Sequence, residues 1–436
     1  MVLVLAHMLA LAWALQSDHW NFPDSDRYRV AAENLVHHGQ LYARAWPMEV
    51  PRGQAVQEFT IRPPGYPTVL AVLGGTGAYP WLVLVLQNGL SLLALGTVLN
   101  WWAQRVRPSS KHWSGAIALT LTFPAQLIYA NAVMSEAFLQ GLLLVMVAGL
   151  TAFYRTGRLH FWIAVAGAVT LALLLKPVCC LLAVGAGATG IVFGWKQRRA
   201  LVFVIGMVPL LVMGVYMAWN QQRTGYFHFS SITEINLLHY NAAGVVRQLE
   251  GPAAEESWVA QVLREADAKA DFAARQQVIQ QKSEAVLLAH PWVYARQHLT
   301  GMVAFFLDPG RFDISEFLGL EPLKGGGLLA QVRTGGLWGA VRQLPLGQLA
   351  ALLVVLLANT TRVVLAAWGF CQLGRGPREW QVARWLAVGL LVYLALLTGP
   401  LGAARFLMPA WPLLLGLALM GMRGPAAKLT ANGASL

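Results

Sequence analysis

Long apolar runs separated by short polar breaks make up most of this chain of 436 residues. A membrane-spanning helix needs about 20 mostly apolar residues, because each adds about 1.5 Å and the hydrocarbon core is about 30 Å thick. The pattern therefore predicts an all-α integral membrane protein with about ten (10–12) spanning helices. The runs are residues 1–16, 80–102, 113–130, 137–153, 159–175, 178–194, 200–219, 347–370, 384–400 and 404–422.

Two long polar stretches, residues 17–66 and 220–345, interrupt this pattern. They divide the chain into an N-terminal transmembrane module (1–219) that contains the first stretch, the second stretch itself, and a C-terminal module (346–436) with a short tail. We expect both stretches to lie on the same side of the membrane.

Apolar side chains also occur next to and within the polar stretches. Residues 67–79 are apolar but too short and too rich in glycine to span, so we expect them at the membrane interface. Residues 252–300 alternate apolar and charged positions at helical spacing, which predicts amphipathic helices over the membrane surface. Their apolar positions include Trp258, Val262, Phe272, Val278 and Leu287.

Acidic and basic residues lie in different parts of the chain. Eighteen of the 20 Asp and Glu residues lie in the two polar stretches, whereas the short breaks hold 13 Lys and Arg residues and one acid, Glu379. Cytosolic loops are enriched in Lys and Arg, so the polar stretches are expected outside. Ten alternating spans that start from a cytosolic N-terminus also place both polar stretches outside. We expect a plasma (bacterial inner) membrane protein with both termini cytosolic and an extracytoplasmic site.

Composition narrows the possible classes of protein. With 57% hydrophobic and 12% charged residues and a mean hydropathy of +0.52, a soluble fold is implausible. The net charge of +12 follows from the cytosolic breaks, so it encodes orientation and gives no nucleic-acid footprint. The three cysteines form no zinc or disulfide pattern.

The first polar stretch contains the segment DSDRYRVAAENLVHHG, which begins at Asp24. As structure, it predicts a helix capped by Asp24 or Ser25 and ended by Gly39. A carboxylate at a helix start beside the membrane can also act as a base or a metal ligand. Asp24 and Asp26 are therefore the candidate catalytic carboxylates.

Two motifs suggest nucleotide binding and are discounted. Asp24–Ser25–Asp26 matches the D-x-D signature of sugar-nucleotide transferases, but no segment here has a βαβ pattern. Residues 185–190 match G-x-G-x-x-G but lie within an apolar run, without the acidic residue that would bind ribose. The second motif instead predicts a small-residue face for close helix packing.

Several charged residues lie at the predicted outer ends of spans. Arg62 precedes Pro-Pro-Gly-Tyr-Pro, which predicts a rigid turn with Tyr66 at the interface, and its guanidinium could bind a phosphate. Lys176 and Arg405 end or begin apolar runs, and each alone could simply extend to the headgroups. Glu136, which follows Ser135, is typical of the first turn of a helix. Arg362 lies within a run and should face protein or water.

Six segments together resemble the GT-C superfamily of polyprenyl-phosphate-dependent glycosyltransferases. This group includes the protein O-mannosyltransferases, the lipid A aminoarabinose transferases and family 39-like membrane proteins. The segments follow the family's order and lie on the predicted outer face. They are PDSDRYRVAAENLVHHG (23–39), RPPGYP (62–67), PAQLIYANAVMSEAF (124–138), LLLKP (173–177), WNQQRTGYFHFSSITEINL (219–237) and ARFLMPAWP (404–412).

The resemblance implies roles for individual residues. Asp24 matches the acid usually taken as the catalytic base, while Arg27, Tyr28 and Arg62 match residues near the lipid phosphate. In the aminoarabinose transferases a Glu that helps bind metal directly precedes the basic residue, and here that position is Ile61. No cofactor is therefore certain. A divalent metal is possible, with Asp24, Asp26 and Glu58 as its weak candidate ligands.

The sequence thus predicts a membrane glycosyltransferase that moves a sugar from a polyprenyl-phosphate donor to a glycan, lipid or protein acceptor at the outer face. Lys176 and Arg405 would join the phosphate contacts, with Glu136 and Tyr66 in support. A transporter or lipid flippase would bind near the bilayer midplane between repeats, and no repeat is visible. A non-catalytic protein that binds a lipid-linked sugar is a further alternative.

Overall fold

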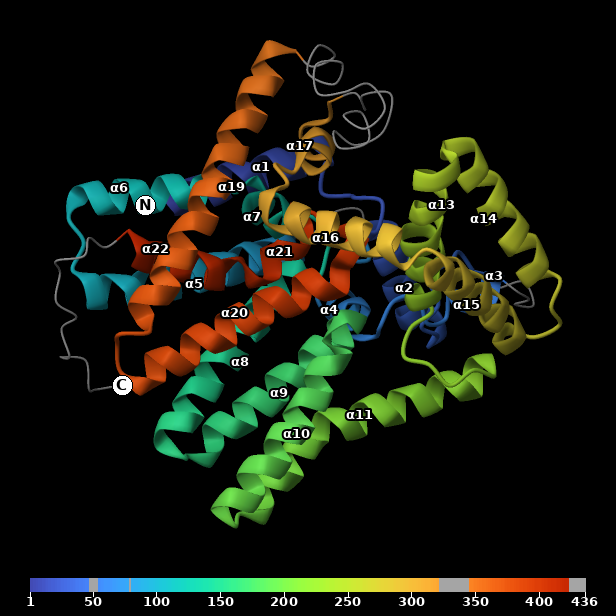
Figure 1. Ribbon diagram of the computed structural model, residues 1–436, viewed down its shortest axis with the longest axis horizontal. Helices are drawn as coiled ribbons and strands as arrows, with labels where there is room; N and C mark the ends of the chain where they lie inside the picture. Colours follow the sequence, from blue (N-terminus) through green and yellow to red (C-terminus); the bar gives the residue numbers. More distant parts are fainter. Residues whose placement is uncertain (47–53, 78–79, 321–344, 423–436) are drawn as a thin grey trace.

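The structure is a computed structural model that describes residues 1–46, 54–77, 80–320 and 345–422, and all regular structure within these ranges is helical (Figure 1). Seven of its helical segments are long and apolar enough to cross a membrane, which confirms the predicted all-α membrane class. Two further predicted spans are shorter apolar helices, α1 (Val2–Ser17) and α9 (Leu159–Leu175). The seven are α5 (Trp81–Val106), α8 (Glu136–Thr156), η1 with α10 (Pro177–Gln197), α11 (Ala200–Thr224), α19 (Leu346–Leu373), α20 with η3 (Arg378–Leu401), and α21 with η4 and α22 (Ala404–Gly421).

The predicted span 113–130 is wrong as a single helix. The chain forms α6 (Ser110–Leu121) and α7 (Pro124–Ala130), separated at Thr122 and Phe123. Pro124 has no N–H to continue the hydrogen-bond ladder, so the last carbonyls of α6 need other donors.

Arg362 supplies that donor from α19. Its Nε and Nη2 donate to the Leu119 carbonyl oxygen at 3.0 and 2.7 Å. The same guanidinium contacts Asn359 and Thr122 and lies 5.0 Å from the centre of the Trp411 ring. Arg362, which was expected to face protein or water, is therefore buried in protein. It satisfies the Leu119 carbonyl at the end of α6.

Helix pairs pack closely throughout the apolar part of the molecule. α8 packs on α9, α10 on α11 and α19 on α22, and every residue of α22 is buried. The glycine-rich motif of α10 serves such packing, as predicted, because a Cβ on Gly190 would lie 2.9 Å from the Cα of Gly206 on α11. Close backbone approach of this kind is typical of small residues between membrane helices.

The helices of the polar stretches and of the interface segment are α2 (Ser25–His38), α3 (Gln54–Gln57), α4 (Gly65–Val72), α12 (Ile232–Asn236), the π-helical turn η2 (Leu237–Ala242), α13 (Ala243–Glu250), α14 (Pro252–Asp267), α15 (Phe272–Ala289), α16 (Pro291–Leu307) and α17 (Arg311–Leu318). The helices α2, α3 and α13–α15 of the polar stretches lie on the right of Figure 1, with the N-terminus on the left, and α17 lies beside α1. Residues 252–300 are mostly helical, and Val262 and Phe272 are buried. The interface segment after Arg62 is helical over Gly65–Val72. Residues 321–344 and the predicted tail 423–436 lie outside the described residues.

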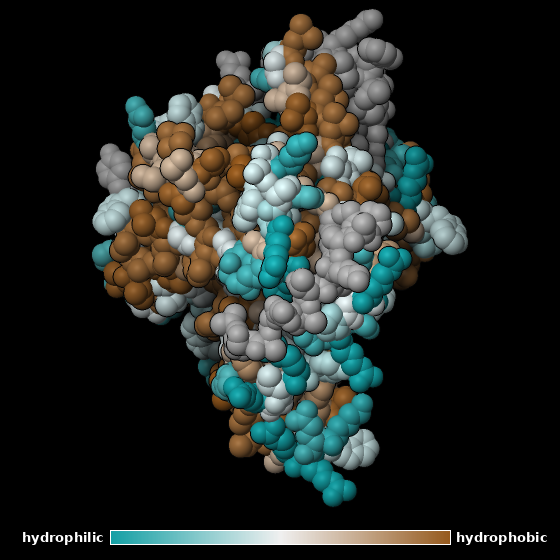
Figure 2. Space-filling view, turned by 90° about the vertical axis from the view of Figure 1, so that its left-hand side faces the viewer, coloured by the Kyte–Doolittle hydropathy of each residue, from teal (hydrophilic) through white to brown (hydrophobic). Residues whose placement is uncertain are grey.

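Hydrophilic side chains also lie at the ends of apolar helices that point away from the polar stretches. Figure 2 shows them at the lower tip of the molecule, where Figure 1 places the turn between α10 and α11. Lys196, Arg198 and Arg199 are exposed at this turn. Large areas of the same face are apolar, as a surface in contact with lipid requires.

Candidate active site

Asp24 lies at the start of α2 and forms ion pairs with two arginines. Its Oδ1 is 2.6 Å from Nη2 of Arg62, and its Oδ2 is 2.8 Å from Nη2 of Arg405. Asp24 occupies the position that caps α2, but its side chain makes no capping hydrogen bond. Both of its oxygens instead bind guanidinium groups that come from distant parts of the chain.

Arg405 connects this pair to a second carboxylate, Glu136, in the first turn of α8. Nε of Arg405 donates to Oε1 of Glu136 at 2.8 Å, and Nζ of Lys176 donates to the same oxygen at 2.7 Å. Five residues that sequence analysis singled out separately therefore form one network. We call Asp24, Arg62, Glu136, Lys176 and Arg405 the charge cluster.

Local structure places each member of the charge cluster. Pro63 and Pro64 follow Arg62 and directly precede α4, and Gly65, the first residue of α4, lets it approach α9 closely. A Cβ on Gly65 would lie 2.6 Å from the Leu174 carbonyl oxygen, so only glycine fits without a shift. Lys176 follows two residues later, where Pro177 ends α9. The Pro-Pro-Gly sequence thus brings Arg62 and Lys176 to the same place.

Two aromatic rings support Arg62. Its guanidinium carbon lies 4.6 Å from the centre of the Tyr28 ring, a distance typical of a cation–π contact. Tyr28 meets the edge of Tyr66 at 5.0 Å between ring centres, and the Tyr66 hydroxyl donates to Oε1 of Gln87 at 2.7 Å. Tyr28 and Tyr66 are both buried, so this side of Arg62 is held by packed side chains.

The charge cluster carries a net positive charge, because three cations share two carboxylates. Burial disfavours the charged form of Asp24, but the nearby charges of Arg62 and Arg405 outweigh it and hold the pKa of Asp24 well below its usual range. Among the described residues, Nε of Arg62 and Oε2 of Glu136 are buried without a hydrogen-bond partner. The cluster therefore has unused donor capacity and an excess of positive charge, which suits an anionic ligand.

Three other predicted residues lie outside the charge cluster. Asp26 is exposed, accepts a hydrogen bond from Asn21 at 3.0 Å and lies 4.0 Å from Arg29. Arg27 pairs with the buried Glu58 at 3.5 Å. Asp24, Asp26 and Glu58 thus have different partners. Among the described residues no group of three His, Cys, Asp or Glu side chains could hold a metal ion, so the candidate ligands do not fit a metal site.

An apolar groove of about 650 Å³ is lined in part by residues that lie one or two positions from members of the charge cluster in the sequence. Pro64 and Gly65 line it just after Arg62, Phe138 lines it two residues after Glu136, and Leu175 lines it just before Lys176. From there the groove continues between α4, α5, α8 and α9 along leucine, valine and alanine side chains. Its far end is formed by side chains such as Thr97 and Ala148.

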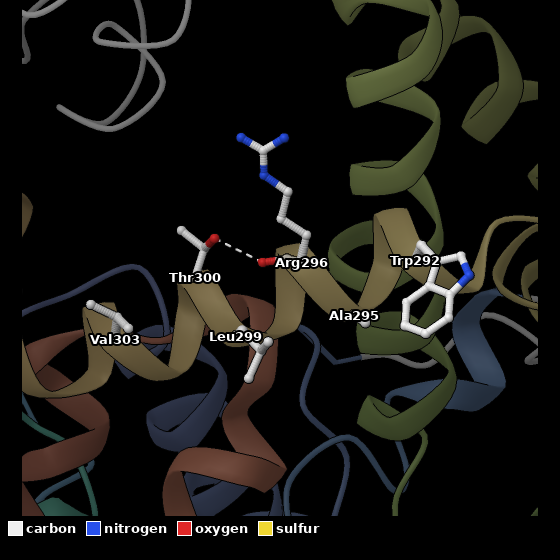
Figure 3. A pocket seen from close by; sticks show the side chains of 6 residues that line it. All are labelled: Trp292, Ala295, Arg296, Leu299, Thr300 and Val303. Carbon is white, nitrogen blue, oxygen red and sulfur yellow. Dashed lines mark hydrogen bonds between the residues drawn. The ribbon is translucent and has the colours of Figure 1, made fainter.

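A second, shallower hollow of about 530 Å³ lies along one face of α16 (Figure 3). Its lining residues all come from this helix, and Thr300 donates to the Arg296 carbonyl oxygen at 2.8 Å. Trp292, Leu299 and Val303 are exposed in it. None of its lining residues adjoins a member of the charge cluster in the sequence, so we do not assign it to the same site.

Sequence analysis missed a buried acid beside the charge cluster, Asp313 of α17. Its Oδ1 accepts a hydrogen bond from the Tyr129 hydroxyl at 2.7 Å, and the Tyr129 ring lies 5.7 Å from the Arg405 guanidinium. Burial raises the pKa of Asp313 to about 7. Asp308 accepts from the backbone N–H of Ala404 at 3.0 Å and so holds the start of α21, which carries Arg405. The turn sequence Asp308-Pro309-Gly310 was the only local signal.

No protein-family model and no curated protein matches this chain. Two solved structures of ArnT from Cupriavidus metallidurans are similar to it, one bound to undecaprenyl phosphate and one in the apo state. The alignments cover 96% and 97% of this chain and 77% of each ArnT chain, at 15% identity and with TM-scores of 0.35 and 0.33. At these scores the similarity does not decide the activity, which must follow from the site itself.

Proposed function

We propose that this protein is a membrane glycosyltransferase that takes a sugar from a polyprenyl-phosphate donor at the outer face of the membrane. The observation that carries the proposal is that the apolar groove is lined by residues one or two positions from Arg62, Glu136 and Lys176 of the charge cluster. A polyprenyl phosphate has the matching shape, an anionic head on a long apolar tail. Guanidinium and ammonium groups are well suited to bind its phosphate.

The residues present can support displacement at the sugar. An acceptor hydroxyl attacks the anomeric carbon, the bond from that carbon to the phosphate oxygen breaks, and the electron pair stays on the phosphate. Arg62, Lys176 and Arg405 would stabilise the negative charge that develops there, since they are already held in place by ion pairs. Asp24, the more exposed of the two carboxylates, would accept the proton of the hydroxyl. Attack from the side opposite the phosphate gives inversion.

The segments that resemble the GT-C superfamily support the same reading, because Asp24, Arg62, Lys176 and Arg405 lie in four of them. The excess of Lys and Arg in the opposite breaks supports an outward-facing site. The sugar and the acceptor are left open by this proposal.

The test uses the purified full chain in lipid nanodiscs and a panel of synthetic polyprenyl-phosphate sugars. We expect release of polyprenyl phosphate from at least one donor, and we expect Arg62→Gln to lower that release about 10²-fold or more. Lys282→Gln, which removes a half-exposed cation of α15, is the matched control and should retain activity. Binding without release from any donor would make the protein a non-catalytic binder, and no binding would contradict the proposal.

A further inference from the structure

We infer that the Asp24 carboxylate and the substrate phosphate compete for the same two guanidinium groups, so that phosphate binding and charge development release Asp24 to act as the base. This inference rests on the proposed function and adds a coupling between the phosphate and the proton acceptor. It follows from the way in which the charge cluster divides its contacts.

The first step is the state of Asp24. Both of its oxygens are engaged, one at 2.6 Å from Arg62 and the other at 2.8 Å from Arg405. A carboxylate whose pKa is held well below its usual range is a poor proton acceptor at neutral pH. While both ion pairs persist, Asp24 is therefore a weaker base than an ordinary aspartate.

The second step concerns the two arginines. Nε of Arg405 is already used by Glu136, and Tyr28 packs against the Arg62 guanidinium. The Nη2 atoms that bind Asp24 are thus among the donors that a phosphate at the end of the groove would need. A phosphate that binds both arginines through these Nη2 atoms takes over the contacts of Asp24, whereas one that binds only the unpartnered Nε of Arg62 would leave them in place.

The third step is the difference between the two carboxylates. The side chain of Glu136 is 1% exposed and that of Asp24 is 30% exposed. Release of Glu136 would leave a buried charge unpaired, which is costly, whereas a released Asp24 can face water. Asp24 is therefore the carboxylate that exchanges, and Glu136 is the fixed partner of Lys176 and Arg405.

The exchange has a direction during the reaction. A phosphate diester that links lipid and sugar carries one negative charge, and the monoester that leaves carries close to two at neutral pH. As charge develops on the leaving phosphate, it attracts Arg62 and Arg405 more strongly and weakens their hold on Asp24. The base thus gains strength in the step in which the acceptor loses its proton.

The test measures binding of polyprenyl monophosphate, without a sugar, to purified full-length protein. Asp24→Asn keeps the shape but removes the competing charge, so we expect it to bind about tenfold more tightly than wild type. Glu33→Gln is the matched control, because it neutralises an exposed carboxylate of the same helix, and it should bind as wild type does. The uncharged polyprenol should bind all three proteins equally.

The outcomes separate the two proposals. Tighter binding by Asp24→Asn, together with a larger ligand-induced rise in Tm, supports the exchange. Equal or weaker binding by Asp24→Asn would overturn it while leaving the proposed function intact. No binding by wild type or any variant would instead contradict the proposed function. Should Asp24→Asn fail to fold, Asp24→Ser removes the same charge and is judged by the same criteria.

Discussion

The charge cluster and the helices of residues 247–289 both contain ion pairs, but they divide their charges differently. In the helices each ion pair joins one cation to one acid, as in Arg275 with Asp267 and Lys282 with Glu265, both at 2.7 Å. In the charge cluster three cations share Asp24 and Glu136. Paired charges neutralise one another, whereas unequal sharing leaves positive charge beside an apolar groove. The proposed function uses this excess of positive charge, which the one-to-one pairs of the helices do not have.

The largest effect that would test this difference is expected at Asp24. Asp24→Asn should give a folded, membrane-inserted protein whose turnover is lower by about 10²–10⁴-fold, as is typical for loss of a general base. Asp26→Asn should cause a milder loss, because Asp26 is exposed and contacts Asn21. The measurement is release of polyprenyl phosphate from a donor that wild type uses. The reverse order of the two losses would move the base to Asp26, and full activity of both would remove it from this loop.

The second effect is expected at Lys176. Lys176→Gln removes one cation from the cluster and leaves Glu136 with Arg405 only. Turnover should fall by about 10²–10³-fold, because one preorganised contact to the developing charge is lost. Single-turnover kinetics would place the loss in the chemical step. A variant that binds poorly but reacts at the wild-type rate when saturated would make Lys176 a binding residue only.

A smaller effect concerns the pH dependence of stability. The folded-state pKa of Asp313 is raised to about 7, above the ordinary value for Asp of about 4. The folded state therefore holds this proton more tightly, so its contribution to stability is present below about pH 4 and is lost as the pH rises to about 7. In Asp313→Asn, Tm should fall less than in wild type between pH 5 and pH 8. Identical pH profiles would show that Asp313 does not titrate in this range.

The smallest effect is expected in the helices of residues 247–289. Lys282→Gln breaks a one-to-one pair between two half-exposed side chains, so both Tm and turnover should stay at wild-type values. Thermal unfolding and the donor assay measure the two quantities in the same preparation. A large loss of turnover here would erase the distinction between the charge cluster and the outer helices.

The all-helical membrane class could be predicted because the length and hydropathy of an apolar run can be read locally along the chain. The exception lies near Pro124, because hydropathy does not register a missing N–H and so predicts one helix over 113–130. The charged residues at the ends of spans could be identified as candidates from sequence, since few charged residues occur at such positions. The contacts that they share could not be predicted, because these contacts depend on the approach of α4 to α9 at Gly65.

Sequence alone could not tell which acids of the second polar stretch are buried and which are exposed. Asp313 is buried against Tyr129, whereas Asp267 is half exposed, yet both occur among charged and apolar residues at helical spacing. Only packing against α7 distinguishes Asp313. A buried acid in a mixed-charge segment therefore gives no local signal apart from the turn that precedes it.

The contact of Arg362 with the end of α6 has a consequence for biogenesis. A lone arginine near the centre of a span costs about 2.5–3.5 kcal/mol on insertion, and here the Leu119 carbonyl oxygen receives two of its hydrogen bonds. The last fifth of the chain, residues 346–436, thus depends on a segment that the ribosome delivers much earlier. A fragment that begins at residue 346 should insert poorly by itself. Its insertion should improve when residues 1–345 are co-expressed, or when the fragment carries Arg362→Leu. The translocon would then meet a helix that becomes a stable span only after its partner is in place.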